Sequence, residues 1–199
     1  MANTNNPFGF RQYRSTGSVP TFEQTTALIA YDNSTPIYFG DAVIPLTTGY
    51  IGQATASTVA MAGIFVGCKY LSTSQKRTVW SNYWPGNDVA STAPDVEAYL
   101  ISDPNAQFVV QAGGTNIGKA NINEYIQLNV GTGNASTGIS GMYVESPNTT
   151  VTLPFIVRGL IDAPPGAPGT VSTGTYNWVI VGFNNAITRT NGAGPTGIA

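Results

Sequence analysis

Three carboxylates lie close together in one short stretch of the chain: Asp95, Glu97 and Asp103. Paired acids hydrolyse glycosidic bonds when a rigid scaffold holds them about 5 to 10 Å apart. Asp95 and Glu97 are separated by one residue, so on a strand they would share a face, about 7 Å apart. Because any two acids at this spacing share that geometry, we interpret the pair as solvated residues at a strand end.

Asp103 has a structural interpretation of its own. Residues 103–106 read Asp-Pro-Asn-Ala, the order that a type I turn favours. The Asp carboxylate would accept a local backbone N–H, and Pro would fix the backbone at the bend. Apolar residues alternate with more polar ones on both sides of the turn: Val96, Ala98, Leu100, Phe108 and Val110. The stretch 98–112 is therefore predicted to be a β-hairpin.

Few other residues are of the types that act in catalysis or bind metals and cofactors. The chain has no histidine, which removes the commonest general base and metal ligand, and its one cysteine, Cys68, lies in an apolar stretch typical of a buried thiol. Asp32 and Asn33 are not part of a calcium-binding loop, and no phosphate-binding glycine motif occurs. We expect no catalytic residue, no metal site and no cofactor, and hence a protein that is not an enzyme.

The surface is predicted to be weakly charged. Charged residues make up 9% of the chain, against about 25% in an ordinary soluble domain, and the net charge is −2. Without a basic patch we expect no nucleic-acid partner. The start has no apolar core of a signal peptide, and the apolar run 59–66 is shorter than the roughly 20 residues that span a bilayer, so no membrane partner is expected.

Short apolar runs separated by turn residues predict the fold. Runs of four to eight residues recur between residues 25 and 183, and no window has a sustained helical period. We predict a single all-β domain over 25–183, either a β-barrel or a β-sandwich, with a jelly roll as one form. Long Gly/Pro-containing loops are expected at 84–94 and 162–176, and a flexible C-terminal tail at 184–199.

Residues 1–24 have two interpretations. The segment is polar and aperiodic, as in a frayed terminus, but it also carries aromatic residues and arginines. The second interpretation is an extended N-terminal arm that these side chains anchor on another surface. Both remain open at this level.

A cluster of aromatic residues also has two interpretations. Trp80, Tyr83 and Trp84 could form a stacking platform for sugars, or they could belong to the core and rim of the fold. We favour core and rim.

Several short motifs recur in the order typical of one family. They are Pro7-Phe8-Gly9-Phe10-Arg11, Gly40-Asp41-Ala42-Val43, Gly63-Ile64-Phe65-Val66-Gly67, Ser102-Asp103-Pro104-Asn105 with Phe108, Gly138-Ile139-Ser140-Gly141-Met142, Arg158-Gly159-Leu160 with Pro164, and Trp178-Val179-Ile180-Val181. In these the chain resembles the capsid decoration, or cement, proteins encoded among the head genes of tailed bacteriophages. The tail after Phe183 departs from the family pattern.

The resemblance implies a structural virion protein, made in the host cytoplasm, that sits on the outer capsid. Its partners would be the major capsid protein and neighbouring copies, with a homo-oligomer expected. We predict that the arm and the 162–176 loop carry the capsid contacts, through Phe8, Phe10, Arg11, Tyr13, Arg14, Pro164, Pro165 and Pro168. The alternative is a carbohydrate-binding module of a phage fibre or surface protein.

Overall fold

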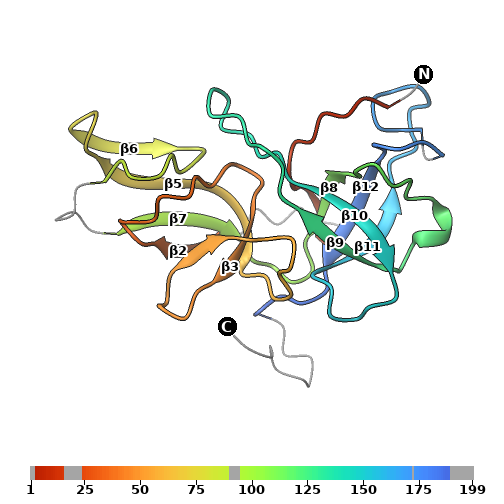
Figure 1. The fold of residues 1–199 in the computed structure, drawn as a ribbon, viewed down its shortest axis with the longest axis horizontal. Helices are drawn as coiled ribbons and strands as arrows, with labels where there is room; N and C mark the ends of the chain where they lie inside the picture. The colour runs from red at the N-terminus through yellow and green to blue at the C-terminus, as the bar shows by residue number, and fades with distance from the viewer. Residues whose placement is uncertain (1–2, 16–23, 90–94, 172, 189–199) are drawn as a thin grey trace.

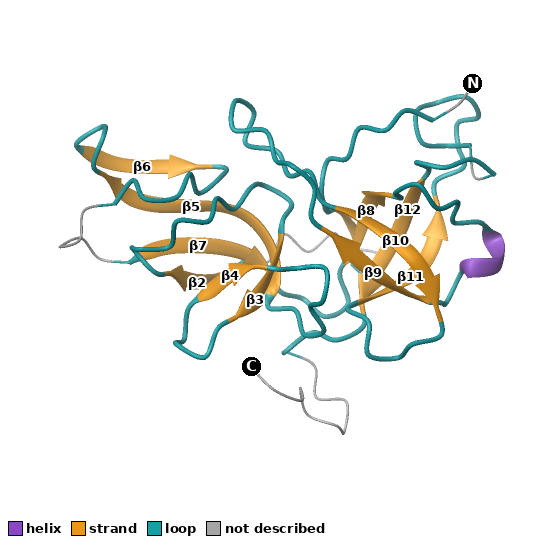
Figure 2. Cartoon of the chain, in the orientation of Figure 1, coloured by secondary structure: helices purple, strands orange, loops and turns teal. Residues whose placement is uncertain are grey.

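The chain folds into two β-structured bodies that lie side by side (Figures 1 and 2). A computed structural model describes residues 3–15, 24–89, 95–171 and 173–188. Within these ranges there are twelve strands, one 3-10 helix and no α-helix. The strands form two antiparallel six-stranded sheets, which confirms the prediction of an all-β fold.

The first body is built from residues 25–101. Its strands are β2 (Thr25–Ile29), β3 (Ala42–Pro45), β4 (Ile51–Gln53), β5 (Gly63–Ser72), β6 (Arg77–Ser81) and β7 (Val96–Ile101). They are ordered β2-β7-β5-β3-β4, and β6 pairs with the second half of β5. Because β4 returns to lie beside β2, the sheet curls round its core, and we refer to this body as the first barrel.

The second body is built from residues 107–183. It contains β8 (Gln107–Gln111), the 3-10 helix η1 (Lys119–Asn121), β9 (Tyr125–Asn129), β10 (Tyr143–Asn148), β11 (Phe155–Leu160) and β12 (Trp178–Phe183). The order is β8-β12-β11-β9-β10. A bridge between Ala112 and Val144 brings β10 back to the end of β8, and the Gly113 N–H donates to the Val144 carbonyl at 2.8 Å. This body is the second barrel.

The two barrels have the same strand order. If the five strands of each barrel are numbered in chain order, leaving out the inserted β6, the order across each sheet is first, fifth, fourth, second and third. All neighbouring strands in this order are antiparallel. Both spans, 25–101 and 107–183, are 77 residues long. In both, the fourth strand has a register shift opposite the fifth, between Phe65 and Gly67 and between Val157 and Gly159. The chain is therefore a tandem structural repeat.

Equivalent strand positions face the same way in the two barrels. The registers pair Ala27 with Ala98 in the first barrel and Val110 with Val179 in the second. Ala98, Val110 and Val179 belong to the core of their own barrel, and the partly buried Ala27 packs against it, because alternate residues of a strand point to one face. The other inward residues follow the same equivalence: Ile29 and Ala112, Val43 and Ile126, Phe65 and Val157, Leu100 and Val181.

A joint of short backbone segments locks the two barrels together. Phe39 of the first barrel forms a bridge with Ile139 of the second, and the Ala42 N–H lies 3.2 Å from the Met142 sulfur. The N-terminal segment crosses the same place, where the Gly9 N–H donates to the Met142 carbonyl and the Phe10 N–H to the Gly40 carbonyl. Gly9 has a φ of +73°, and a side chain there would collide with residue 140.

The predicted hairpin at 98–112 is wrong, although its turn is present. The Asp103 carboxylate accepts the Asn105 N–H at 2.8 Å, and the Asp103 carbonyl accepts the Ala106 N–H at 3.0 Å. However, β7 before the turn pairs with β2 and β5, whereas β8 after it pairs with β1 and β12. The turn therefore joins the two barrels instead of closing a hairpin, and the single domain expected over 25–183 stays a prediction.

Both predicted ends are partly built into the fold. The strand β1 (Arg11–Arg14) pairs with β8, so the described residues 3–15 lie on the second barrel and are not a projecting arm. Residues 184–188 return to the first barrel, where Ala186 bridges Met61 and the Thr188 hydroxyl donates to the Ser102 carbonyl at 3.1 Å. Residues 16–23 of the predicted arm, 90–94 of a predicted loop and 189–199 of the predicted tail lie outside the described residues.

Candidate binding surface

Phe10, predicted to contact the capsid, is a core residue instead. It is 1% exposed, stacks on Phe155 with 4.5 Å between ring centroids, and meets Phe108 edge to face at 6.5 Å. Its neighbours Gly9 and Arg11 give no apolar pattern, so its burial depends on contacts with Phe108 and Phe155, which are far away along the chain. Phe10 is therefore unavailable to a partner.

The other N-terminal residues of the predicted contact set lie on the outside of the second barrel. Phe8 is half-buried against Trp178, edge to face at 5.1 Å, and the Arg11 guanidinium lies 4.9 Å above the Phe8 ring. Arg14 lies 5.4 Å from the ring of Tyr13, which is 48% exposed. Arg11, Tyr13 and Arg14 thus remain exposed.

The prolines of the predicted contact set are also exposed. Pro164, Pro165 and Pro168 lie in the connection between β11 and β12. The later part of this connection meets the start of the chain, because the Asn3 side-chain amide donates to the Val171 and Thr175 carbonyls at 3.0 and 2.9 Å.

An open sheet face on the first barrel is a surface that the sequence reading did not identify. The registers place Leu28, Glu97, Lys69 and Trp80 in one row across β2, β7, β5 and β6. Leu28 is 45% exposed and Trp80 is 68% exposed. A groove of about 410 Å³ runs along this face, lined by Thr26, Ala27, Leu28, Lys69, Tyr70, Leu71, Thr78, Asp95 and Glu97. We call this surface the open face.

The sequence did contain a signal for the open face. In β5, Cys68 and Tyr70 are buried, whereas Lys69 and Leu71, which alternate with them, point outward. Leu71 is an apolar residue at an outward-facing position of the strand. Such a residue indicates an outer face that is not fully polar.

The candidate acids are both held by partners at the open face. Asp95 accepts a hydrogen bond from the Tyr50 hydroxyl at 2.9 Å, and Glu97 pairs with the Lys69 ammonium at 3.2 Å. The hydrogen bond to Asp95 raises the pKa of Tyr50 above its ordinary value of 10.0. These groups offer donors and acceptors to a ligand, while Asp103 serves the turn between the barrels.

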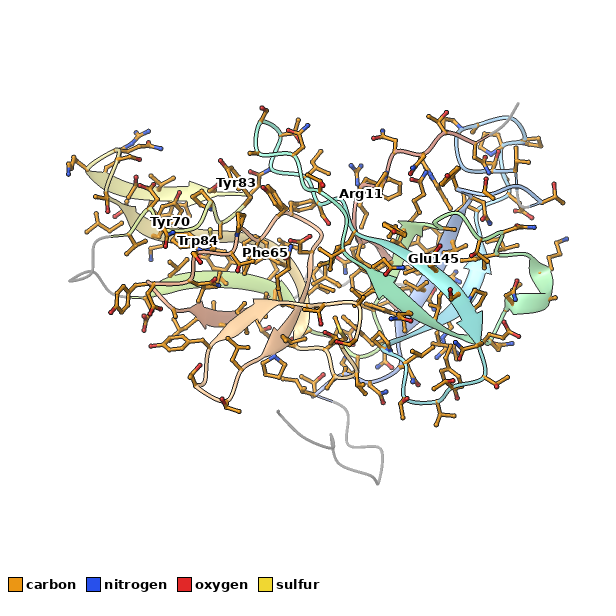
Figure 3. All side chains as sticks on the ribbon, viewed as in Figure 1. Arg11, Phe65, Tyr70, Tyr83, Trp84 and Glu145 are labelled. Atoms are coloured by element: carbon orange, nitrogen blue, oxygen red, sulfur yellow. The ribbon has the colours of Figure 1, made fainter. Side chains whose placement is uncertain are left out.

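The aromatic cluster is divided between core and surface, with Trp84 0% and Trp80 68% exposed. Figure 3 labels its members Tyr83 and Trp84, with Tyr70 beside Trp84. Trp84 is fully buried, meets Tyr70 edge to face at 5.1 Å, and donates its indole N–H to the Asn33 carbonyl at 3.1 Å. Tyr83 stacks on Tyr38 at 5.6 Å. The core-and-rim interpretation describes Trp84 and Tyr83, whereas Trp80 belongs to the open face.

Two other titratable groups are buried away from the open face. Burial raises the pKa of the Cys68 thiol to about 12. Asp41, at the joint, is 1% exposed, and burial raises the pKa of its carboxyl above 3.8 although Ser140, the Tyr38 backbone and Gln53 hydrogen-bond to it. Both groups are enclosed by the fold, so neither is presented to a ligand.

Two functional features are absent from the part of the chain that the structure describes. None of their helices has the length and apolarity to cross a membrane. No group of three or more Cys, Asp or Glu side chains among them is arranged to hold a metal ion.

Comparison of the chain with protein-family models, with curated proteins and with solved structures finds no match.

Proposed function

We propose that this protein is a non-catalytic structural protein of a tailed-phage virion that attaches to the outer capsid and stabilises contacts between major capsid subunits. The observation that carries the proposal is the open face, where large apolar side chains stand exposed on a sheet that nothing among the described residues covers. Leu28, Leu71 and Trp80 are 45%, 43% and 68% exposed. Exposed apolar surface of this kind is typical of a protein-binding site.

The arrangement of the two barrels supports a bridging role. The open face lies on the first barrel, whereas the exposed Tyr13 and the prolines of the β11–β12 connection belong to the second. The β11–β12 connection lies at the end of the molecule away from β6 (Figure 1). The joint makes one body of the two barrels. Two separated contact surfaces on one body allow simultaneous attachment to two subunits, which strengthens binding without any strong single contact.

Addition of the purified protein to capsids that lack it tests this proposal. We expect saturable binding to expanded capsids and a higher temperature of capsid disruption, measured by light scattering and by release of packaged DNA. Absence of binding to expanded capsids would contradict the proposal.

Trp80 favours carbohydrate binding as a second candidate function. An exposed indole ring beside polar groups such as Thr78 and Glu97 can stack on a sugar and hydrogen-bond its hydroxyls. A glycan array decides this candidate: a hit that disappears in Trp80→Ala supports it, and an array without hits removes it.

A further inference from the structure

The tandem repeat gives the open face a counterpart on the second barrel. Leu28 pairs with Glu97 across β2 and β7, and at the same register Gln111 pairs with Trp178 across β8 and β12. The equivalence continues to the fourth strand, where Lys69 lies opposite Glu97 and the Ile161 N–H donates to the Trp178 carbonyl.

On the second barrel this position is covered by an extended segment of the chain. The Gln111 side-chain amide donates to the Thr4 carbonyl at 2.9 Å, and its oxygen accepts the Asn6 N–H at 2.9 Å. Further along, Phe8 packs against Trp178. Gln111 is left only 2% exposed, although it points away from the barrel core. The outer face of the first and fifth strands is therefore used here as a seat for an extended peptide.

On the first barrel the same seat is uncovered among the described residues. Its charges are complementary to the segment that fills the other seat. Asp95 and Glu97 outnumber Lys69 along the groove, so the seat is net acidic, whereas the segment on the second barrel carries Arg11 directly above Phe8. A basic, aromatic-containing peptide fits both the charge and the apolar side chains of the open face.

We propose that the open face binds an extended segment of the major capsid protein that carries an aromatic residue followed closely by arginine. The segment would lie across β2, β7 and β5 as residues 3–11 lie across β8 and β12, with the aromatic ring near Leu28 or Trp80 and the guanidinium near Glu97. This inference rests on the proposed function for the identity of the partner.

Titration with a synthetic peptide tests the seat without capsids. The probe has the sequence of residues 3–14 and is added to the full-length, isotope-labelled protein. The second barrel keeps its own tethered segment, since tethering gives that segment a high effective concentration. We expect amide shifts at Leu28, Lys69 and Leu71 and at the Trp80 indole, with affinity that falls as salt rises. No shifts, or shifts confined to Gln111 and Trp178, would overturn the inference.

Two variants sharpen the titration. Glu97→Lys reverses the charge facing the arginine and is expected to weaken peptide binding about tenfold or more. The matched control is Val151→Ser, which changes a 64% exposed residue on the second barrel and should leave binding unchanged. Equal affinity of Glu97→Lys and the unaltered protein would contradict the proposed orientation, and an unchanged unfolding midpoint confirms that both variants fold.

Capsid binding separates the two proposals. A photo-reactive amino acid at position 80 should cross-link to a capsid-protein peptide that contains an aromatic residue and arginine, and the same group at position 151 should not. Capsid attachment with cross-links only from position 151 would overturn the docking inference and leave the proposed function standing. Peptide binding at the open face without capsid attachment would refute the proposed function and the named partner. The assignment of the open face as a peptide-binding surface would still stand.

Discussion

The two barrels share a strand order and a bulge, yet their outer faces differ. In the second barrel the outward residues Gln111 and Trp178 are covered by the N-terminal segment, whereas in the first barrel Leu28 and Glu97 stay open. The inward residues of both are buried, except that Ala27 is only partly so. Topology therefore decides how each barrel closes, and the outward side chains decide what each barrel can bind.

A second difference extends the open face. The first barrel contains the additional strand β6, which pairs with β5 and brings Trp80 into the row with Lys69 and Glu97. The corresponding position in the second barrel holds the long connection between β11 and β12, which has no strand among its described residues. The inserted strand thus adds an exposed indole to one repeat only.

The largest effect is expected where the N-terminal segment enters the second barrel. Phe10→Ala should lower the free energy of unfolding by about 3–5 kcal/mol, because it empties a fully enclosed aromatic site. Chemical denaturation measures this loss. The control Tyr13→Ala, three residues further along the same segment but 48% exposed, should change stability by less than about 1 kcal/mol. Equal effects of the two variants would mean that the segment is not part of the core.

The joint between the barrels is the next target. Asp41→Ala should cost about 2–3 kcal/mol, since it leaves the partly buried Tyr38 N–H and Gln53 amide, both 2.8 Å from the carboxylate, without their acceptor. The loss is measured by denaturant unfolding at neutral pH. An effect near zero would show that water replaces the carboxylate and that the joint is open.

The pH dependence of Asp41 has a defined sign. Burial raises its pKa above 3.8 in the folded state, so the folded protein binds the proton more tightly than the unfolded chain. The stabilising contribution of the protonated carboxyl is complete below 3.8 and is lost as pH rises through the raised pKa. Relative to Asp41→Asn, the unaltered protein should therefore gain stability as pH falls from 7 toward 4, and the opposite trend would refute the assignment.

Equivalent residues of the two barrels provide a direct comparison. Trp178→Ala should lower the free energy of unfolding by about 2 kcal/mol, because the indole packs between Phe8 and the sheet. Its counterpart Glu97→Ala should cost less than about 1 kcal/mol, because the ion pair with Lys69 is solvent-exposed. Parallel unfolding curves measure both. A reversed order would mean that the covered and open seats have been assigned to the wrong barrels.

Local features of the sequence predicted local features of the structure. The Asp-Pro-Asn order at 103–105 gave the correct turn, because its hydrogen bonds lie within four residues. The strand pairing predicted for the same stretch was wrong, since the sequence does not show that β7 pairs with β2 and β8 pairs with β12. Burial of Phe10 could not be predicted for the same reason: its contacts with Phe108 and Phe155 are about a hundred or more residues away along the chain.

The motifs that suggested a family turn out to meet in space. Gly9, Gly40, Phe65 and Met142 come from four of these motifs, and backbone hydrogen bonds connect them at the joint. Their glycines and short polar residues permit close backbone approach, which is a requirement of the fold. The packing of the joint therefore explains why glycines and short polar residues occur in these motifs, without any contact to a capsid.

The sequence by itself determined the strand-rich fold, the turn at Asp103, the weakly charged surface and the lack of histidine chemistry, because each depends on composition or on neighbours a few residues apart. Only the tertiary structure decided that the chain is a repeated barrel, that Phe10 is core, and that one of two equivalent faces is covered while the other is open. Those outcomes depend on contacts between segments that are far apart in the sequence. Such contacts cannot be predicted from the residue types of either segment alone.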